Sequence, residues 1–424
     1  MPFRPLLFVL LVAAILLSCK KNPSPSGLPL NEISNKTYSE AWLEIEKMEK
    51  KGLGKTIIRK TDSILLLAKE ENNISQIFKA LAYRSKYLNY IEEESTVKIL
   101  SQYESYIEES SFPLNQILHS AIAELYDQYY QQNRWRFDDR STAKSQEEKD
   151  IRSWSLDQIL ETVRSHYLSS LQPQAELSNF PTSSILPMLS LRHTSDQIKV
   201  EDSRFRPTLF DFLAQRSLNY FQRNEGRITA PIEEFKIDDY DVFSPASDYA
   251  GLQFETEDRK SNQYLSAIIY QMLLRQHQED EDKLVSVDFD LARLRYFAIS
   301  SNQIAKDSLY LKALKTLSNQ HPEGEIADAI NYAIAQWYFQ QGSTYTIDAP
   351  EKKWFLKIAH DICESMEEKS SFAALQSQVL LQMIRQPSHS FQLEDTYLPS
   401  APILFRFQYK TVTFTFFKIV RVPH

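Results

Sequence analysis

The distribution of apolar residues along the chain predicts a protein built mainly from amphipathic helices. Between residues 38 and 137, apolar side chains recur at the i, i+3, i+4, i+7 spacing that places them on one face of a helix. Pro113 stands where a helix can begin. Successive helix pairs start near residues 38, 73 and 113. This interval is typical of tetratricopeptide-like hairpins, which stack because one hairpin cannot bury its own apolar face.

The helical pattern continues beyond this region in two further stretches. Residues 138–262 contain a charged stretch, a helix that Ser155 caps and another that Arg206–Leu209 opens, with loops between them. From 263 to 395 the spacing is again helical, and its most repeat-like part is 308–342, a helix, a Pro-Gly turn and a second helix. We therefore expect a first helical body at 38–137, a loop-rich helical linker region at 138–262 and a second helical body at 263–395.

The period of the apolar positions changes near the end of the sequence. Apolar side chains occupy every second position from Ile403 to Tyr409 and again from Val412 to Phe416. Such alternation predicts two β-strands, because successive side chains of a strand point to opposite faces. A lone hairpin is marginal in water. We therefore expect residues 396–424 to be an incomplete β region, and the fold class to be mainly α with a short C-terminal β-hairpin.

The first 18 residues predict a targeting segment that does not belong to the fold. Arg4 precedes an apolar run from Leu6 to Leu17, which is short for a permanent membrane span. The run leads into Leu16-Leu17-Ser18-Cys19, which resembles a bacterial lipobox. That resemblance implies cleavage of residues 1–18 and a lipid on Cys19; a plain signal peptide with a chance cysteine is the alternative. Residues 19–37, polar and rich in Pro and Ser, would then form a tether.

Composition and charge narrow the classes of function. Only 7 of the 424 residues are Gly, and none forms a phosphate-binding loop or a nucleophile elbow. The formal net charge of −8 argues against nucleic acid as a partner. The eight His residues form neither an HExxH motif nor a Cys/His cluster, so we expect no metal and no cofactor. If Cys19 carries the lipid, Cys363 has no disulfide partner and is expected to be a small core residue.

One cluster of Arg and Trp follows the first helical body and is a candidate interface. It consists of Arg134, Trp135, Arg136 and Arg140. Two Arg residues that flank a Trp can stack on a ligand or a partner. They can equally clamp the helical body onto the next domain, and we favour that structural role.

Several segments carry a further resemblance in the order in which they occur. They are Lys51–Lys55, Ala68–Glu70, Lys79–Leu81, Tyr129–Phe137, Asp150–Trp154, Arg206–Ala214 and Pro402–Val422. Together with the lipobox ahead of them, they resemble the N-terminal region of a bacterial alpha-2-macroglobulin family of large envelope lipoproteins. The resemblance implies a helical region ahead of macroglobulin β-sandwiches, with the opening strands of the first sandwich after Pro402.

The family also implies entrapment, in which a protease cuts a bait segment and the inhibitor closes around it. In many members a CxEQ thioester cysteine then reacts with nearby nucleophiles, whereas the sequence here is Cys363-Glu364-Ser365-Met366. We therefore expect a non-enzymatic, truncated N-terminal module that does not inhibit proteases alone. Proteases would be partners only if the missing C-terminal domains are present. The expected location is the bacterial cell envelope, as an outer-membrane lipoprotein held by Cys19.

Two other classes of function stay open at this point. A SusD-like glycan-binding lipoprotein also uses tetratricopeptide-like helices and exposed aromatic residues, and glycan binding by the mature chain would favour it. The alternating C-terminal pattern disfavours that class. An enzyme that the motifs do not reveal is the third possibility.

Overall fold

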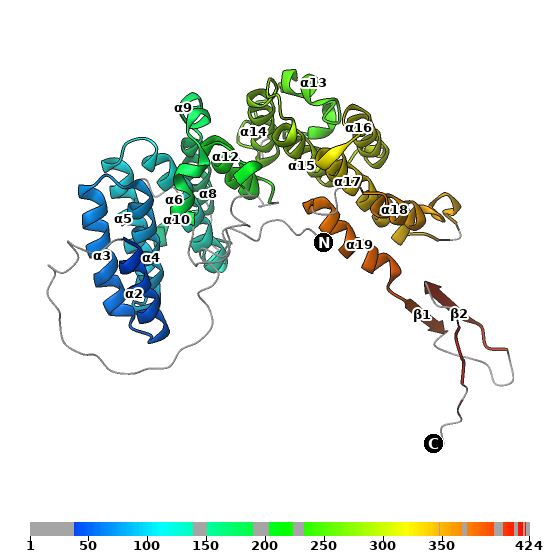
Figure 1. Ribbon diagram of the computed structural model, residues 1–424, viewed down its shortest axis with the longest axis horizontal. Helices are drawn as coiled ribbons and strands as arrows, with labels where there is room; N and C mark the ends of the chain where they lie inside the picture. The colour runs from blue at the N-terminus through cyan, green and yellow to red at the C-terminus, as the bar shows by residue number, and fades with distance from the viewer. Residues whose placement is uncertain are drawn as a thin grey trace. The chain divides into compact units, whose positions relative to one another are not determined.

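A computed structural model describes residues 38–138, 151–189, 203–223, 233–346, 348–366, 371–393, 402–410, 414–418 and 420. The described chain is mainly helical and contains one two-stranded antiparallel sheet (Figure 1). Its contacts divide it into two units: unit 1 takes its residues from 1–236 and 253–279, and unit 2 from 237–252 and 280–424. The predicted signal peptide, the tether and Cys19 lie outside the described residues.

Unit 1 opens with the helix pairs that the apolar spacing predicts. The helices are α2 (Tyr38–Lys50), α3 (Gly54–Glu70), α4 (Ile74–Ile91), α5 (Ser95–Glu109) and α6 (Leu114–Gln132). Consecutive members pack side by side (Figure 1). The pair starts predicted near residues 38, 73 and 113 are confirmed to within one residue. The apolar spacing therefore determines both where these helices begin and which face they bury.

Side-chain caps explain why two of the helices in unit 1 begin where they do. The Asn73 side chain accepts a hydrogen bond from the backbone N–H of Gln76 at 3.2 Å, which starts α4. Ser155 and Gln158 form a reciprocal capping box at the start of α8 (Leu156–Ser170). Both caps satisfy N–H groups that the first turn of a helix leaves without partners. The predicted cap at Ser155 is thus confirmed.

The remaining elements of unit 1 are α7 (Arg134–Asp138), η2 (Ile151–Ser153), α9 (Gln174–Asn179), η3 (Thr182–Ile185), α10 (Leu186–Leu189), α12 (Leu209–Phe221) and α14 (Asn262–Gln276). Among them, α7 packs against α6, α10 against α4, and α12 against α6, α8, α9 and α14. Arg216 of α12 donates to the Glu124 carboxylate of α6 at 2.6 Å and to the Ser120 hydroxyl at 2.7 Å. These bonds fix α12 on α6 through a charged side chain that is itself largely buried.

Unit 2 is a second run of helices. It comprises η4 (Ile237–Asp239), α13 (Ala246–Gly251), α15 (Leu284–Ser300), α16 (Lys306–Gln320), α17 (Gly324–Ser343), η5 (Pro350–Lys352), α18 (Phe355–Glu364) and α19 (Phe372–Arg385). The predicted helix, turn and helix of 308–342 are α16 and α17. Gly324 starts α17 with a φ of +83°, which Gly adopts without strain. Gly342 lies where α17 and α18 approach so closely that a Cβ would be 2.9 Å from the Leu356 nitrogen.

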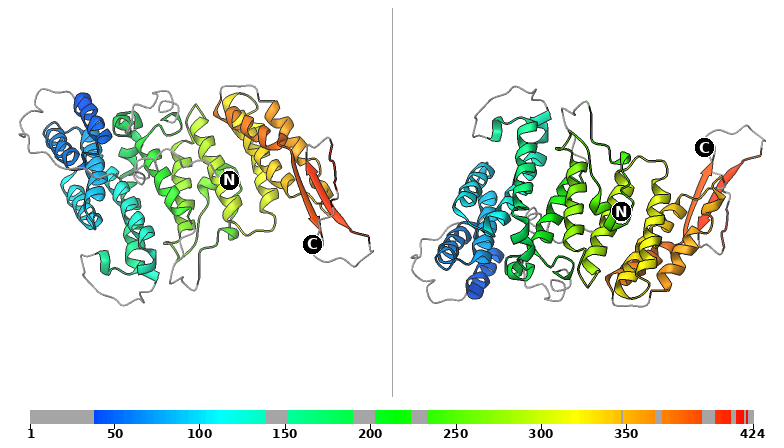
Figure 2. Two further views of the ribbon diagram at one scale, coloured as in Figure 1. Left: turned by 90° about the horizontal axis from the view of Figure 1, so that it is seen from below. Right: turned by 90° about the horizontal axis from the view of Figure 1, so that it is seen from above.

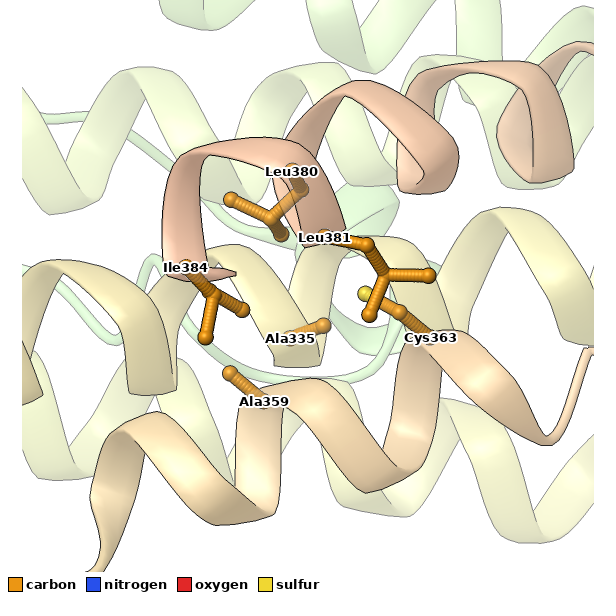
Figure 3. Close-up of a cluster of buried hydrophobic side chains, with 6 residues drawn as sticks. All are labelled: Ala335, Ala359, Cys363, Leu380, Leu381 and Ile384. Carbon is orange, nitrogen blue, oxygen red and sulfur yellow. The ribbon is translucent and has the colours of Figure 1, made fainter. Parts of the chain in front are cut away.

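The core between α17, α18 and α19 contains the cysteine predicted to be a core residue. Cys363 is buried together with Ala335, Ala359, Leu380, Leu381 and Ile384. In Figure 3 the three side chains of α19 point toward the other three residues. Burial raises the pKa of the Cys363 thiol to about 11. This cysteine is therefore an inert packing residue, as expected.

A buried Arg joins the segment 237–252 to α15 within unit 2. Arg293 has a fully buried side chain and donates to the carbonyl oxygens of Val242 at 2.6 Å and Ser244 at 3.0 Å. Its Nε also donates to Asp290 at 2.8 Å, and its guanidinium lies 4.3 Å from the ring centroid of Tyr249. One side chain thus satisfies the Asp290 carboxylate, the buried Val242 carbonyl and the partly buried Ser244 carbonyl.

The C-terminal hairpin forms with a different partner from the predicted one. The strand predicted from Ile403 to Tyr409 is β2 (Phe405–Lys410), but it pairs with β1 (Ser388–Leu393) rather than with 412–416. Residues 414–418 are described and belong to no strand. Pro387 prevents the helix from continuing, and only Gln386 and Pro387 separate α19 from β1. The alternation of Phe391 and Leu393 with polar residues then favours a strand.

Candidate interaction surface

The hairpin has one apolar and one polar face. Residues that lie opposite each other across two strands share a face, and alternate pairs share it too. The pairs on the first face are His389 with Tyr409, Phe391 with Phe407 and Leu393 with Phe405. The pairs on the second face are Ser388 with Lys410, Ser390 with Gln408 and Gln392 with Arg406. Both strands therefore contribute to an aromatic face, which we call the hairpin face.

Ring contacts hold the hairpin face together. The rings of Phe391 and Phe405 are 5.0 Å apart, and those of Phe407 and Tyr409 are 5.7 Å apart and stacked. Phe417 lies against the same face, with its ring 5.2 Å from Phe407 and 5.4 Å from Phe405. These separations are the usual ones for attractive aromatic pairs. The two strands lie side by side in both views of Figure 2.

Most of the hairpin face remains accessible to solvent despite these contacts. The exposed fractions are 48% for Phe391, 45% for Phe405 and 66% for Tyr409. A two-stranded sheet has no third strand or second layer that could bury such side chains. Contiguous exposed apolar surface of this kind marks an interaction site in a soluble protein.

Helix α19 presents a second apolar surface on the side away from its core. Leu375, Val379 and Met383 are spaced four residues apart and are 58%, 57% and 45% exposed. This spacing places them in one line along the helix. The last helix of a stacked array usually has a polar outer side. The Lys410 ammonium donates to the Met383 carbonyl at 2.9 Å, so the end of this line is also attached to the hairpin.

The predicted Arg–Trp cluster lies at the start of α7. Trp135 is 63% exposed, and the Arg136 guanidinium lies 5.0 Å from its ring centroid. The Arg134 guanidinium instead lies 5.5 Å from the ring of Tyr130 in α6. Arg140 is outside the described residues. The structure thus brings Trp135 and Arg136 together at the surface and turns Arg134 toward the helical body.

Phe137 is the residue of this region that sequence reasoning missed. It is buried, and its ring contacts Tyr130 at 5.7 Å and Tyr129 at 6.2 Å. The signal was available, because Trp135 and Phe137 are the two apolar residues of Arg134–Arg140 and the other five are charged. Phe137, rather than Trp135, attaches α7 to α6.

The described part of the chain offers neither a metal-binding cluster nor a membrane-spanning helix. Its His, Cys, Asp and Glu residues include no group of three or more that could hold a metal ion. Among the described helices, none combines the length and the apolar character that crossing a membrane requires.

Comparisons with known proteins return no relative. No family model, no curated protein and no solved structure matches the chain. A helical architecture alone does not identify a function.

Proposed function

We propose that this chain is the helical N-terminal module of an alpha-2-macroglobulin-like, protease-trapping protein of the bacterial envelope. The lipid on Cys19 would anchor it, and the helices, in tetratricopeptide-like pairs, would space the trap from the membrane. The observation that supports the proposal is the amphipathic hairpin, whose apolar face is open and whose polar face is suited to water. That is the form expected of the first two strands of a β-sandwich.

The energetics of the hairpin face favour a second β layer as its cover. Sheets that pack face to face lie about 10 Å apart and interdigitate the apolar side chains of their inner faces. Full burial of one large apolar side chain contributes about 1.5–3 kcal/mol. Phe391, Leu393, Phe405 and Tyr409 are each about half exposed. Covering them would therefore contribute on the order of 4 kcal/mol, enough to turn a marginal hairpin into a stable one.

The proposal gives the module a supporting role rather than a chemical one, and the environment of Cys363 is consistent with that. Cys363 is buried and followed by Glu364-Ser365-Met366, which departs from the CxEQ thioester motif. Its raised pKa also disfavours the thiolate that nucleophilic chemistry needs. Trapping would require the β-rich remainder of such a protein, and the 424-residue chain alone is proposed to be non-inhibitory.

The test is a size-selective protease assay on the lipoprotein purified from its native envelope. A trapped protease still cleaves a small chromogenic peptide but no longer cleaves a large protein substrate. We expect that signature from the native protein and no effect on either substrate from the purified 424-residue chain. A native protein that leaves both activities unchanged contradicts the trapping role. Replacing Cys19 with Ser tests the anchor separately, since the variant should lose its lipid and its membrane association.

A SusD-like glycan-binding function is the alternative, and one groove bears on it. Polar side chains and Tyr106 line a shallow groove over α3 and α5. The Lys69 ammonium lies 4.2 Å from the Tyr106 ring centroid, so one face of the only aromatic ring among the lining residues is already occupied. Sugars bind such grooves by stacking on an open ring. Calorimetric titration of the purified chain with oligosaccharides tests this alternative, and binding that Tyr106→Ala abolishes would favour it.

A further inference from the structure

Three helices of unit 1 bring four titratable side chains together. His119 and Tyr126 come from α6, Glu104 from α5 and His166 from α8. The Nδ1 atoms of the two His residues are 2.8 Å apart. The Nε2 atom of His166 is 3.2 Å from Glu104 Oε1, and the Tyr126 hydroxyl donates to the same oxygen at 2.9 Å. The four groups form one chain of hydrogen bonds.

The direction of these bonds limits the number of protons that the His pair can hold. Glu104 accepts from Tyr126, and as a carboxylate it also accepts from the Nε2–H of His166. The two Nδ1 atoms then form a hydrogen bond only when a single proton lies between them. One positive charge on the pair leaves this bond intact, because an imidazolium ring still donates one N–H to the neutral ring. When both rings are charged, each Nδ1 carries a proton, so two N–H groups point at one another across 2.8 Å and two positive rings are in contact.

The environment of the pair resists a second charge. The pKa of His119 is lowered to about 4, chiefly by burial and also by the charge of His166, whereas Glu104 opposes this shift. Burial works against ionisation of Glu104, yet hydrogen bonds from His166 and Tyr126 hold its pKa below the ordinary value. The charged groups that face His119 are therefore His166 from α8 and Glu104 from α5. Both His rings are only partly buried, so protons can reach them.

We propose that the His119–His166 pair is an acid-sensitive latch, which holds α6 against α8 while at most one of the two rings is charged and releases the contact when both are charged. The latch is coupled to the start of α8. The Tyr126 ring stacks on His166 at 5.7 Å and on Trp154 at 5.5 Å. Trp154 immediately precedes Ser155, the cap of α8. Opening of the latch therefore disturbs the segment that leads into α8 as well as the contact itself.

The sign of the pH dependence follows from the pKa of His119. An opened or unfolded state takes up a proton near the ordinary value of 6.5, whereas the closed state does so only near 4. The open state is therefore increasingly favoured as the pH falls from about 6.5 toward 4. Above this window the latch does not change with pH. Full release of a group with these two pKa values favours opening by up to about 80-fold at pH 4.5, and partial exposure reduces this to about 10-fold or more.

Amide hydrogen exchange of the purified chain between pH 7 and pH 4.5 tests the latch. After correction for intrinsic exchange rates, protection of α6 and α8 should fall about 10-fold or more relative to the helices of unit 2. His119→Gln, which keeps a polar group but cannot take up a proton, should remove most of this difference. His389→Gln is the matched control, because His389 is an exposed residue of β1 and its loss should leave the response unchanged.

Two results would overturn the proposal. One is an equal loss of protection in the native chain and in His119→Gln, since the response would then come from other groups. The other is a His119 ring that titrates near 6.5 in the NMR spectrum of the native chain. The second measurement needs no variant, so it decides the matter even if His119→Gln does not fold.

Discussion

Replacing Arg293 with Met removes the buried guanidinium that joins the segment 237–252 to α15 and keeps a side chain of similar reach. Asp290 then loses its counter-charge, and the carbonyl oxygens of Val242 and Ser244 lose their donors. Breaking a buried ion pair from one side costs about 3–5 kcal/mol. Each carbonyl adds about 1 kcal/mol, part of which is recovered as water enters. We expect the free energy of unfolding of unit 2 to fall by about 4 kcal/mol.

The size of this loss depends on pH through Asp290. Burial raises the pKa of Asp290 in the native chain, and the charge and hydrogen bonds of Arg293 oppose that rise. Without Arg293 the pKa rises further, so folded Asp290 keeps a proton that the unfolded chain releases above the ordinary value of 3.8. The folded state then binds more protons than the unfolded state between the two values, and stability decreases as the pH increases. The loss is therefore smallest below about pH 4 and grows toward neutral pH.

Urea titration followed by amide exchange in α15 and α17 measures unit 2 separately from unit 1. The matched control is Arg385→Met, which removes an exposed ion pair with Glu364 and should change stability by less than about 0.5 kcal/mol. Adding Asp290→Asn to Arg293→Met should recover roughly half of the loss, since no buried charge then remains. A loss below about 1 kcal/mol, or an equal loss at pH 4 and pH 7, would contradict the role of Arg293 as the buried donor of this contact.

Three further substitutions or reactions test other features of the chain. Trp135→Ala should lower the free energy of unfolding by less than about 1 kcal/mol, because the ring is exposed and stacks mainly on Arg136; a collapsed melting transition would show instead that Trp135 clamps two parts of the chain. Gly342→Ala should lower the free energy of unfolding of unit 2, measured by urea titration, by about 1–3 kcal/mol, because the new Cβ meets the Leu356 backbone. Gly251→Ala is the control for an added methyl group, because a Cβ at Gly251 meets nothing within 4 Å. Cys363 should react with iodoacetamide at pH 8 only when urea unfolds the chain, because its thiol is buried and has a pKa of about 11. Mass spectrometry measures the labelling, and rapid labelling of the folded chain would contradict the place of Cys363 in the core.

The helices were predictable because their signals are local. Apolar spacing and the caps at Asn73 and Ser155 act within one or two turns, so the starts of α4 and α8 can be read directly from the sequence. The pairing of the strands is not local in this sense. Alternation identified Phe405–Lys410 as a strand but not its partner, and the nearest alternating segment was the wrong choice. Pro387, which ends the helical spacing just before Ser388, was the available signal.

The polar interior contacts could not be predicted from the sequence at all. His119 and His166 are 47 residues apart, and Glu104 comes from a third helix. In the sequence, each of these three residues looks like an ordinary polar residue of an amphipathic helix. Only the packing of α5, α6 and α8 brings them within hydrogen-bond distance. The same holds for Arg293, whose main partners are backbone carbonyls of a segment about 50 positions earlier.

The short join between α19 and the hairpin has a mechanical consequence. The linker consists of two residues, Gln386 and Pro387, and Pro387 has a fixed φ. The hairpin therefore has little freedom to move independently of α19. The hydrogen bond from the Lys410 ammonium to the Met383 carbonyl connects β2 directly to α19 as well. A pull or a rotation applied to the strands is therefore passed directly to α19 and, through Leu380, Leu381 and Ile384, to the packed core around Cys363. The hairpin and the last helix act together as a lever, whereas a long flexible linker would absorb the same force.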